Sequence, residues 1–192
     1  MFSGTAFTQA KSGIENYNLL SQSSGYVWMP VAHYQSKKGI YTELRYNYED
    51  IQTLSFFGGK ALDGGNMFNY TLTPMVGISF GRFSGLSLAA NADLEWKKFY
   101  LSSQTQYSIA TKPGVADFLF SWSEIGYNIT EKFFGGVAIQ YTLQQGEKIA
   151  ETGFVVGLSS KNVSFPVYVF SPFNTGRYFV VGLNYEFDFK RK

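Results

Sequence analysis

The sequence predicts an all-β protein: a closed antiparallel up-and-down transmembrane β-barrel of about ten strands, with eight as the alternative. In residues 178–189 every second residue is large and apolar, which is typical of a β-strand with one apolar face. Aromatic residues make up 19% of the chain and charged residues 16%, against roughly 25% charged residues in an ordinary soluble domain. No run of ~18 apolar residues occurs, so no transmembrane helix is expected.

The chain divides into three expected segments. Residues 1–25 form an N-terminal segment, residues 26–189 the barrel, and residues 190–192 a basic tail. The end of the first ten residues, Thr8-Gln9-Ala10, fits the remnant of a secretory signal peptide, and an ordinary flexible N-terminus is the alternative. Residues 11–25 are polar and lack period-two alternation, so we expect them to be a leader segment or a periplasmic extension.

Ten strands are expected from residue 26 onward, because apolar and polar residues alternate between short turns that carry Gly, Asn or Lys. Their approximate ranges are 26–35, 40–57, 68–80, 86–95, 98–109, 117–128, 133–144, 151–158, 163–169 and 178–189. The second range needs a β-bulge near Asp50 and Ile51 to keep its register. Pro74 lacks an N–H donor and needs a bulge or a weakly paired position. The boundary at Glu95 carries no Gly or Pro, so one long strand is the alternative there.

The polar faces of these strands favour a membrane barrel over a soluble, lipocalin-like barrel that binds lipophilic molecules. They consist mainly of Gly, Ser, Thr, Asn and Gln, which fit a narrow lumen, whereas a soluble barrel would carry Lys and Glu outside. Tyr46, Tyr70 and Tyr185 lie near the ends of apolar faces, as in the aromatic girdles of membrane barrels. Closure follows because lipid cannot satisfy an open sheet edge.

Two features resemble known outer-membrane proteins. The last strand is similar to the C-terminal strand of bacterial outer-membrane barrels, with alternating aromatics and a near-terminal Phe189, although three basic residues follow it. The segments RYNYED at 45–50, TPMVGISFG at 73–81 and FSWSE at 120–124 resemble an uncharacterised family of small outer-membrane barrels over most of residues 26–189. The resemblance implies the fold and a location in the bacterial outer membrane, and it implies no activity.

His33 is the only histidine of the chain, and strand parity places it on the lumen face with Val31 and Gln35. It has the chemistry of a general base, as in barrel-embedded enzymes that act on lipids, but no local motif supplies a nucleophile or an orienting acid. We therefore favour a hydrogen-bonded lumen residue. No enzyme activity, catalytic residue, cofactor or metal site is expected.

Charged residues of the inferred lumen face form the candidate site. These residues are Glu43, Arg45, Glu49, Glu95, Lys98, Glu124, Glu151 and Glu186. One interpretation is a path that conducts protons or small ions, or an acid pair that performs hydrolysis. We favour a structural network of ion pairs that fills a narrow barrel, because unpaired charge would be costly there.

The main functional expectation is a structural or accessory barrel with a side-chain-filled lumen, including a subunit of a larger outer-membrane complex. A narrow channel for small solutes or a lipid-site enzyme is the alternative. A wide pore is not expected, because about eight to ten strands enclose an interior that side chains fill. The expected partners are membrane lipid and other outer-membrane proteins, and the net charge of +2 gives no sign of nucleic-acid binding.

Overall fold

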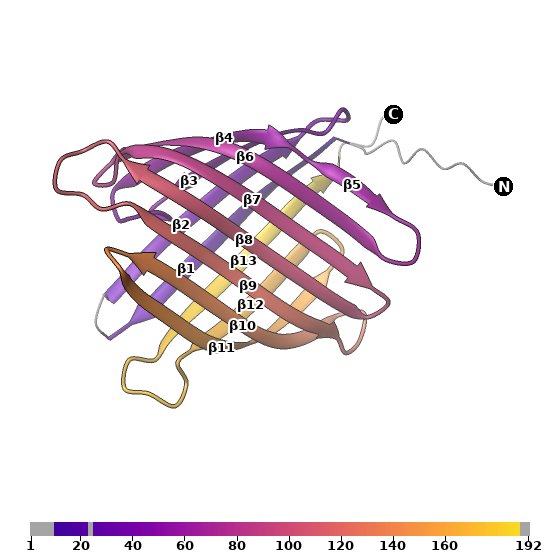
Figure 1. The fold of residues 1–192 in the computed structure, drawn as a ribbon. Helices are drawn as coiled ribbons and strands as arrows, with labels where there is room; N and C mark the ends of the chain where they lie inside the picture. Colours follow the sequence, from indigo (N-terminus) through magenta and orange to yellow (C-terminus); the bar gives the residue numbers. More distant parts are fainter. Residues whose placement is uncertain (1–9, 23–24, 189–192) are drawn as a thin grey trace.

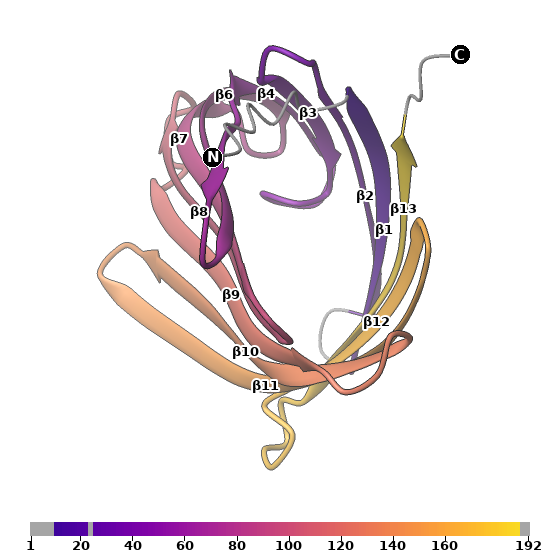
Figure 2. The ribbon, with the colours of Figure 1, turned by 90° about the vertical axis from the view of Figure 1, so that its right-hand side faces the viewer.

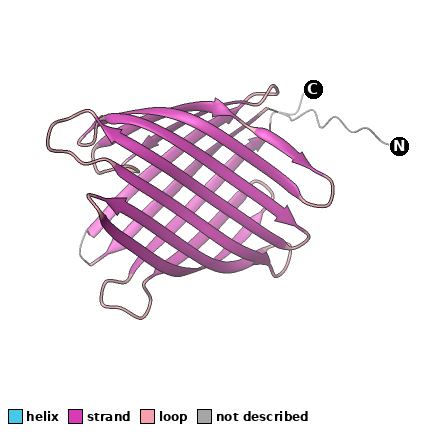
Figure 3. Ribbon diagram, viewed as in Figure 1, coloured by secondary structure: helices cyan, strands magenta, loops and turns pink. Residues whose placement is uncertain are grey.

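The computed structural model describes residues 10–22 and 25–188, and within them the chain forms one antiparallel sheet closed into a barrel (Figures 1 and 2). The strands are β1 (Lys11–Ser21), β2 (Gly25–Gln35), β3 (Ile40–Tyr46), β4 (Thr53–Lys60), β5 (Leu62–Gly65), β6 (Asn69–Gly81), β7 (Gly85–Trp96), β8 (Phe99–Ala110), β9 (Phe118–Asn128), β10 (Phe133–Gln144), β11 (Glu147–Ser160), β12 (Val163–Phe170) and β13 (Tyr178–Asp188). Figure 3 shows strands joined by turns throughout this part of the chain. In the described residues, no helix is long and apolar enough to cross a membrane.

Twelve strands form the ring, in place of the ten expected. Neighbours in sequence pair with one another, and the pairings of β1 with β13 and of β4 with β6 complete the closure. The short β5 lies outside this count, because it pairs with the first residues of β6 beyond the end of β4. The pairing is interrupted opposite Thr73 and Pro74, where proline offers no N–H. Pro74 therefore occupies the weakly paired position that the sequence predicted.

The N-terminal boundary of the barrel differs from the expectation. Residues 11–21, expected to precede the barrel, form β1 and pair with β13 on one side and β2 on the other. Two outward positions of β1 are polar, Asn16 and Asn18, and this obscures the alternation. Tyr26 donates a hydrogen bond to Asn18 at 2.7 Å, and the Trp28 indole donates one to Asn16. The signal-peptide remnant at residues 1–9 and the basic tail at 190–192 lie outside the described residues.

The expected strand over residues 40–57 is two strands joined by a turn, which is the second source of the difference in strand number. Asn47 and Gln52 adopt left-handed φ angles of 57° and 55° at the two ends of this turn. The Asn47 side chain accepts a hydrogen bond from the Gln52 amide at 2.7 Å, as asparagine commonly does in turns. The prediction of a β-bulge near Asp50 and Ile51 is therefore wrong, because the chain turns there. The expected break after Glu95 is confirmed, with a turn at Lys97 and Lys98.

In β3 and β13 the predicted inward and outward faces agree with the structure. In β13, Leu183 is 48% exposed on the outside, whereas Val180 is fully buried on the inside. In β3, Leu44 faces outward and Glu43 and Arg45 face inward, where they are 3% and 2% exposed. The outer surface thus carries large apolar side chains around the whole ring, as lipid contact requires.

Two ends of the barrel are distinguished below. The terminal end is the end at which β1 begins and β13 ends. It carries the turns at residues 36–39, 97–98, 129–132 and 161–162 and the longer connection 61–68, which contains β5. The opposite end, called the loop end, carries the connections 47–52, 111–117 and 171–177 among others.

Candidate functional site

The lumen contains a cavity of about 600 Å³ that occupies the half of the barrel nearer the terminal end. Figure 2 looks into the ring from this end. Its lining comes from almost every strand and combines polar side chains with aromatic and apolar ones. Apart from tyrosines, the polar and charged lining residues are Lys11, Glu15, His33, Gln35, Thr71, Thr73, Asp93, Glu95, Ser102, Gln104, Glu124, Asn128, Ser159, Lys161, Asn162, Ser164, Asn184 and Glu186. The cavity is as large as many small-molecule sites.

Aromatic side chains limit the cavity toward the middle of the barrel. Trp122 of β9 reaches across the lumen to Tyr17 of β1, with ring centroids 5.6 Å apart, and packs against Tyr168 of β12 at 5.0 Å. Five strand-to-strand steps separate β1 from β9 around the ring, so this contact bridges nearly opposite walls. Tyr48, in the β3–β4 turn, bridges the same lumen to Phe120, with centroids 6.1 Å apart.

The half of the lumen nearer the loop end is filled by side chains. Met29, Phe83, Phe118, Phe170 and Val180 are each at most 9% exposed there. Phe83 comes from the β6–β7 turn and stacks edge-on against Phe118, with centroids 5.1 Å apart. The interior therefore combines a wide polar vestibule with a narrow, packed half.

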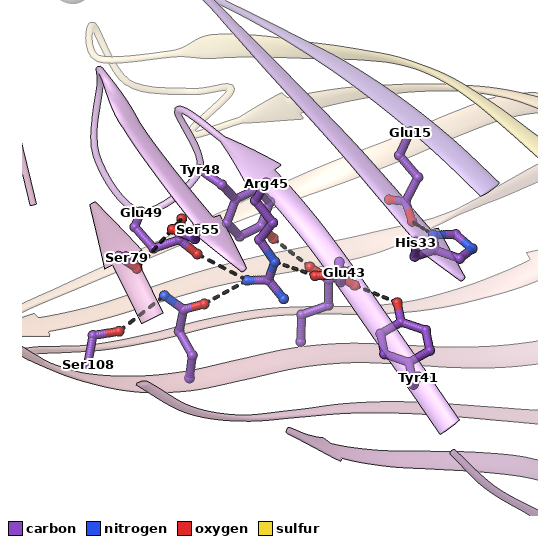
Figure 4. Close-up of polar contacts among 12 residues, drawn as sticks. Glu15, His33, Tyr41, Glu43, Arg45, Tyr48, Glu49, Ser55, Ser79 and Ser108 are labelled. Carbon is purple, nitrogen blue, oxygen red and sulfur yellow. Dashed lines mark hydrogen bonds and ion pairs between the residues drawn. The ribbon is translucent and has the colours of Figure 1, made fainter. Parts of the chain in front are cut away.

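Arg45 is the centre of a buried polar cluster inside the lumen (Figure 4). Its Nε pairs with Glu43, and its Nη1 lies 3.4 Å from Glu49 and donates a hydrogen bond to Gln106 at 2.7 Å. The guanidinium also lies 4.7 Å from the ring centroid of Tyr48. Three of the predicted network residues, Glu43, Arg45 and Glu49, are thus brought together.

The surroundings of this cluster satisfy its remaining polar atoms. Tyr41 donates a hydrogen bond to Glu43 at 2.5 Å, and Ser55 donates one to Glu49 at 2.5 Å. Tyr48 donates to Gln104 at 2.5 Å, and burial raises the pKa of its phenol above the ordinary value, which keeps the hydroxyl a donor. These hydrogen bonds link the cluster on β3 and the β3–β4 turn to β4 and, across the lumen, to β8.

His33 lies between two carboxylates at the edge of the cavity. Its Nδ1 is 3.4 Å from Glu15 and its Nε2 is 3.2 Å from Glu186, and its ring stacks on Tyr41 with centroids 5.9 Å apart. Gly13 permits this position, because a Cβ there would come within 2.4 Å of the imidazole. Both ring nitrogens of His33 thus face carboxylates rather than a hydroxyl group.

The other predicted network residues are dispersed. Glu124 and Glu95 line the cavity. Glu151 accepts a hydrogen bond from Tyr178 at 2.8 Å, apart from the Arg45 cluster. Lys98 lies in the β7–β8 turn, with its ammonium 5.8 Å from the ring centroid of the exposed Tyr127. The structure therefore replaces one predicted network by several separate groups and places Lys98 away from the lumen.

Several lumen residues were absent from the predicted set. Glu15 was overlooked because residues 11–21 were not expected in the barrel. Asp93, which accepts a hydrogen bond from Ser102 at 2.7 Å, has the inward parity of its strand and could have been found from it. Gln106 also has the inward parity of its strand, but no feature of the sequence indicates its contact with Arg45. In the part of the chain that is described, no group of three His, Asp or Glu side chains is arranged to hold a metal ion.

Solved structures with a similar fold are bacterial outer-membrane porins. A KdgM porin in complex with disordered oligogalacturonate aligns with a TM-score of 0.66 and 12% identity, covering 91% of this chain and 99% of that chain. A NanC porin aligns with a TM-score of 0.60 and 10% identity, covering 93% of this chain and 100% of that chain. No protein-family model and no curated protein matches the sequence.

These likenesses show the fold: the chain forms a closed antiparallel β-barrel of porin-like architecture. The expectation of a structural or accessory role is wrong, because the similar structures are porins, and they agree with the alternative of a narrow channel. The physical reason lies in strand number. Two strands more than expected widen the ring, so side chains fill only part of the lumen.

Proposed function

We propose that this protein is a narrow channel through which small polar solutes cross the outer membrane by diffusion. The observation that carries the proposal is the cavity of about 600 Å³ with its polar lining inside a closed twelve-stranded ring. The porin-like fold of the similar structures supports it. The loop-end packing and the Trp122 bridge would restrict passage to small solutes.

The finer features of the proposal follow from the same geometry. The apolar outer face contacts the lipid of the bacterial outer membrane, a location that the porin-like fold supports. The proposed channel assigns His33 no catalytic role, and its ring lies between Glu15 and Glu186. Three expectations stay predictions: the resemblance to an uncharacterised barrel family, an assembly with other outer-membrane proteins, and the lack of nucleic-acid binding.

The similar KdgM porin was solved with an anionic oligosaccharide, oligogalacturonate. We do not extend that ligand to this chain, because the cavity is lined by several carboxylates and few basic side chains. The size of the cavity and its polar side chains define the proposed solutes only as small hydrophilic molecules.

Reconstitution into liposomes tests the proposal. Swelling in isotonic solutions of neutral solutes, from glycerol through mono- and disaccharides, should be faster than in protein-free liposomes and should fall steeply with solute size. An equal amount of heat-unfolded protein is the control for leakiness caused by incomplete insertion. Swelling rates equal to those of this control for every solute would refute a channel function.

A further inference from the structure

The charges that face the lumen are strongly unbalanced. In the described strands, the basic side chains are Lys11, Arg45, Lys60 and Lys148, and only Lys11 and Arg45 have inward parity. Arg45 is 2% exposed and is paired with two carboxylates, so it offers no free positive charge to a solute. The positive charge of the cavity is thus limited to side chains near its mouth.

The cavity itself is lined by five carboxylates: Glu15, Asp93, Glu95, Glu124 and Glu186. Its basic side chains are Lys11 and Lys161, at the terminal end, and His33. Even with His33 counted as a cation, the five carboxyl groups outnumber the three basic side chains. The imbalance therefore does not depend on the protonation state of the histidine.

The carboxylates face one another across the mouth of the cavity. Glu95 is next to the last residue of β7, and Glu186 is two residues from the end of β13. Six strand-to-strand steps separate β7 from β13 in either direction around the twelve-stranded ring, so these strands form opposite walls. A solute entering from the terminal end passes between these two side chains.

We propose that the lumen selects by charge and admits cationic and uncharged small solutes in preference to anionic ones. Carboxylates on opposite walls of a channel are the usual basis of cation selectivity. A cavity with low-dielectric walls also strengthens the field inside it and concentrates ions of opposite sign. This inference names the substrate class of the proposed channel, and its relevance to transport rests on the channel function. The electrostatic preference of the cavity for cations can be measured even if the protein conducts no ions.

The first test uses a single cysteine as a probe of the potential in the cavity. The chain has no cysteine, and Ser164 lines the cavity, so Ser164→Cys introduces one reactive thiol there. In the folded protein, a cationic methanethiosulfonate reagent should react about ten-fold faster than an anionic one, each rate being normalised to a free thiol in solution. Equal rates, or a faster anionic reagent, would overturn the proposal.

Neutralising variants show whether the carboxylates cause the preference. A triple variant in the Ser164→Cys background carries Asp93→Asn, Glu95→Gln and Glu186→Gln. It should bring the ratio of the cationic to the anionic reaction rate close to one. Glu95→Gln alone, at an exposed position, should lower the ratio partly and serves if the triple variant does not fold. Glu131→Gln removes the same charge from the exposed β9–β10 turn, outside the cavity lining, and should leave the ratio unchanged. A ratio unaffected by the cavity variants would contradict the assignment.

Planar bilayers separate this inference from the channel function. Under a KCl gradient, the reversal potential should show a higher permeability for K⁺ than for Cl⁻, and the triple variant should move it toward zero. Conductance with anion preference would overturn the charge selection and leave the channel intact. If the protein does not conduct but the cationic reagent still reacts about ten-fold faster than the anionic one, the channel function is refuted and the preference of the cavity for cations is upheld.

Discussion

Arg45 shows how one basic side chain is accommodated in the interior of the barrel. Its guanidinium lies between Glu43 and Glu49 and 4.3 Å from the ring centroid of Phe57, and it is 2% exposed. Desolvating a charge is costly, and partners on several sides offset this cost only when all of them are present. The cluster is therefore sensitive to the loss of any one member.

Replacing Arg45 by alanine should destabilise the folded barrel by roughly 3–5 kcal/mol, because it leaves two buried carboxylates without their cation. The measurement is urea-induced unfolding in lipid vesicles, followed by tryptophan fluorescence. The control is Arg82→Ala: this arginine pairs with Asp50 at 3.3 Å but its side chain is 59% exposed. Surface pairs of this kind contribute about 0–1 kcal/mol. Similar losses for the two variants would contradict a special role of the buried cluster.

At the scale of single strands, β13 shows how parity fixes the inside and the outside of the barrel. Leu183 faces outward, whereas Gly182 is buried and Asn184 lies beside the Tyr17 hydroxyl at 3.4 Å inside the lumen. A slip of one residue would exchange the two faces along the whole strand. Pairing with β1 over eleven residues and with β12 on the other side holds the register.

The outward position of Leu183 predicts an asymmetric response to charge. Leu183→Arg should reduce folding yield or stability by roughly 2–4 kcal/mol, the cost of arginine on the lipid face near the middle of the membrane. Asn184→Arg should be tolerated better, because its side chain points into the lumen, where space rather than lipid is the limit. Both variants are folded into the same vesicles and compared. Greater damage from Asn184→Arg would reverse the assignment of the two faces.

In the molecule as a whole, the sheet is closed and its outer surface carries large apolar side chains. Every strand of the ring pairs with a neighbour on each side, whereas the short β5 pairs with β6 alone. We expect the purified protein to require detergent and to migrate faster in gel electrophoresis before heating than after it. Full solubility as a monomer without detergent would contradict the membrane barrel.

The aromatic bridge across the lumen leads to a prediction for transport. Trp122→Ala removes the side chain that reaches from β9 to Tyr17 and Tyr168, and should increase single-channel conductance and the size of the largest permeant solute. Trp96→Ala is the control, since Trp96 is 42% exposed at the end of β7 and stacks on the outward-facing Phe99. Equal conductance of the two variants would place the constriction elsewhere.

The sequence by itself determined the class of fold, the face on which most strand residues lie, and the inward position of Glu43, Arg45 and His33. These follow from period-two alternation, which depends only on the local geometry of an extended chain. The closing strand is the clearest case, because Phe179, Leu183 and Tyr185 alternate with residues that fit a lumen.

Only the tertiary structure decided the number of strands and the shape of the lumen. β1 was missed because Asn16 and Asn18 face outward, and their hydrogen-bonding partners Trp28 and Tyr26 lie on the neighbouring strand. Likewise, the contact of Arg45 with Gln106 joins residues 61 positions apart. Such contacts exist only after the sheet has closed, and the diameter of a barrel is set by its strand number and tilt. The cavity, and with it the channel function, is therefore a property of the closed ring rather than of any one segment.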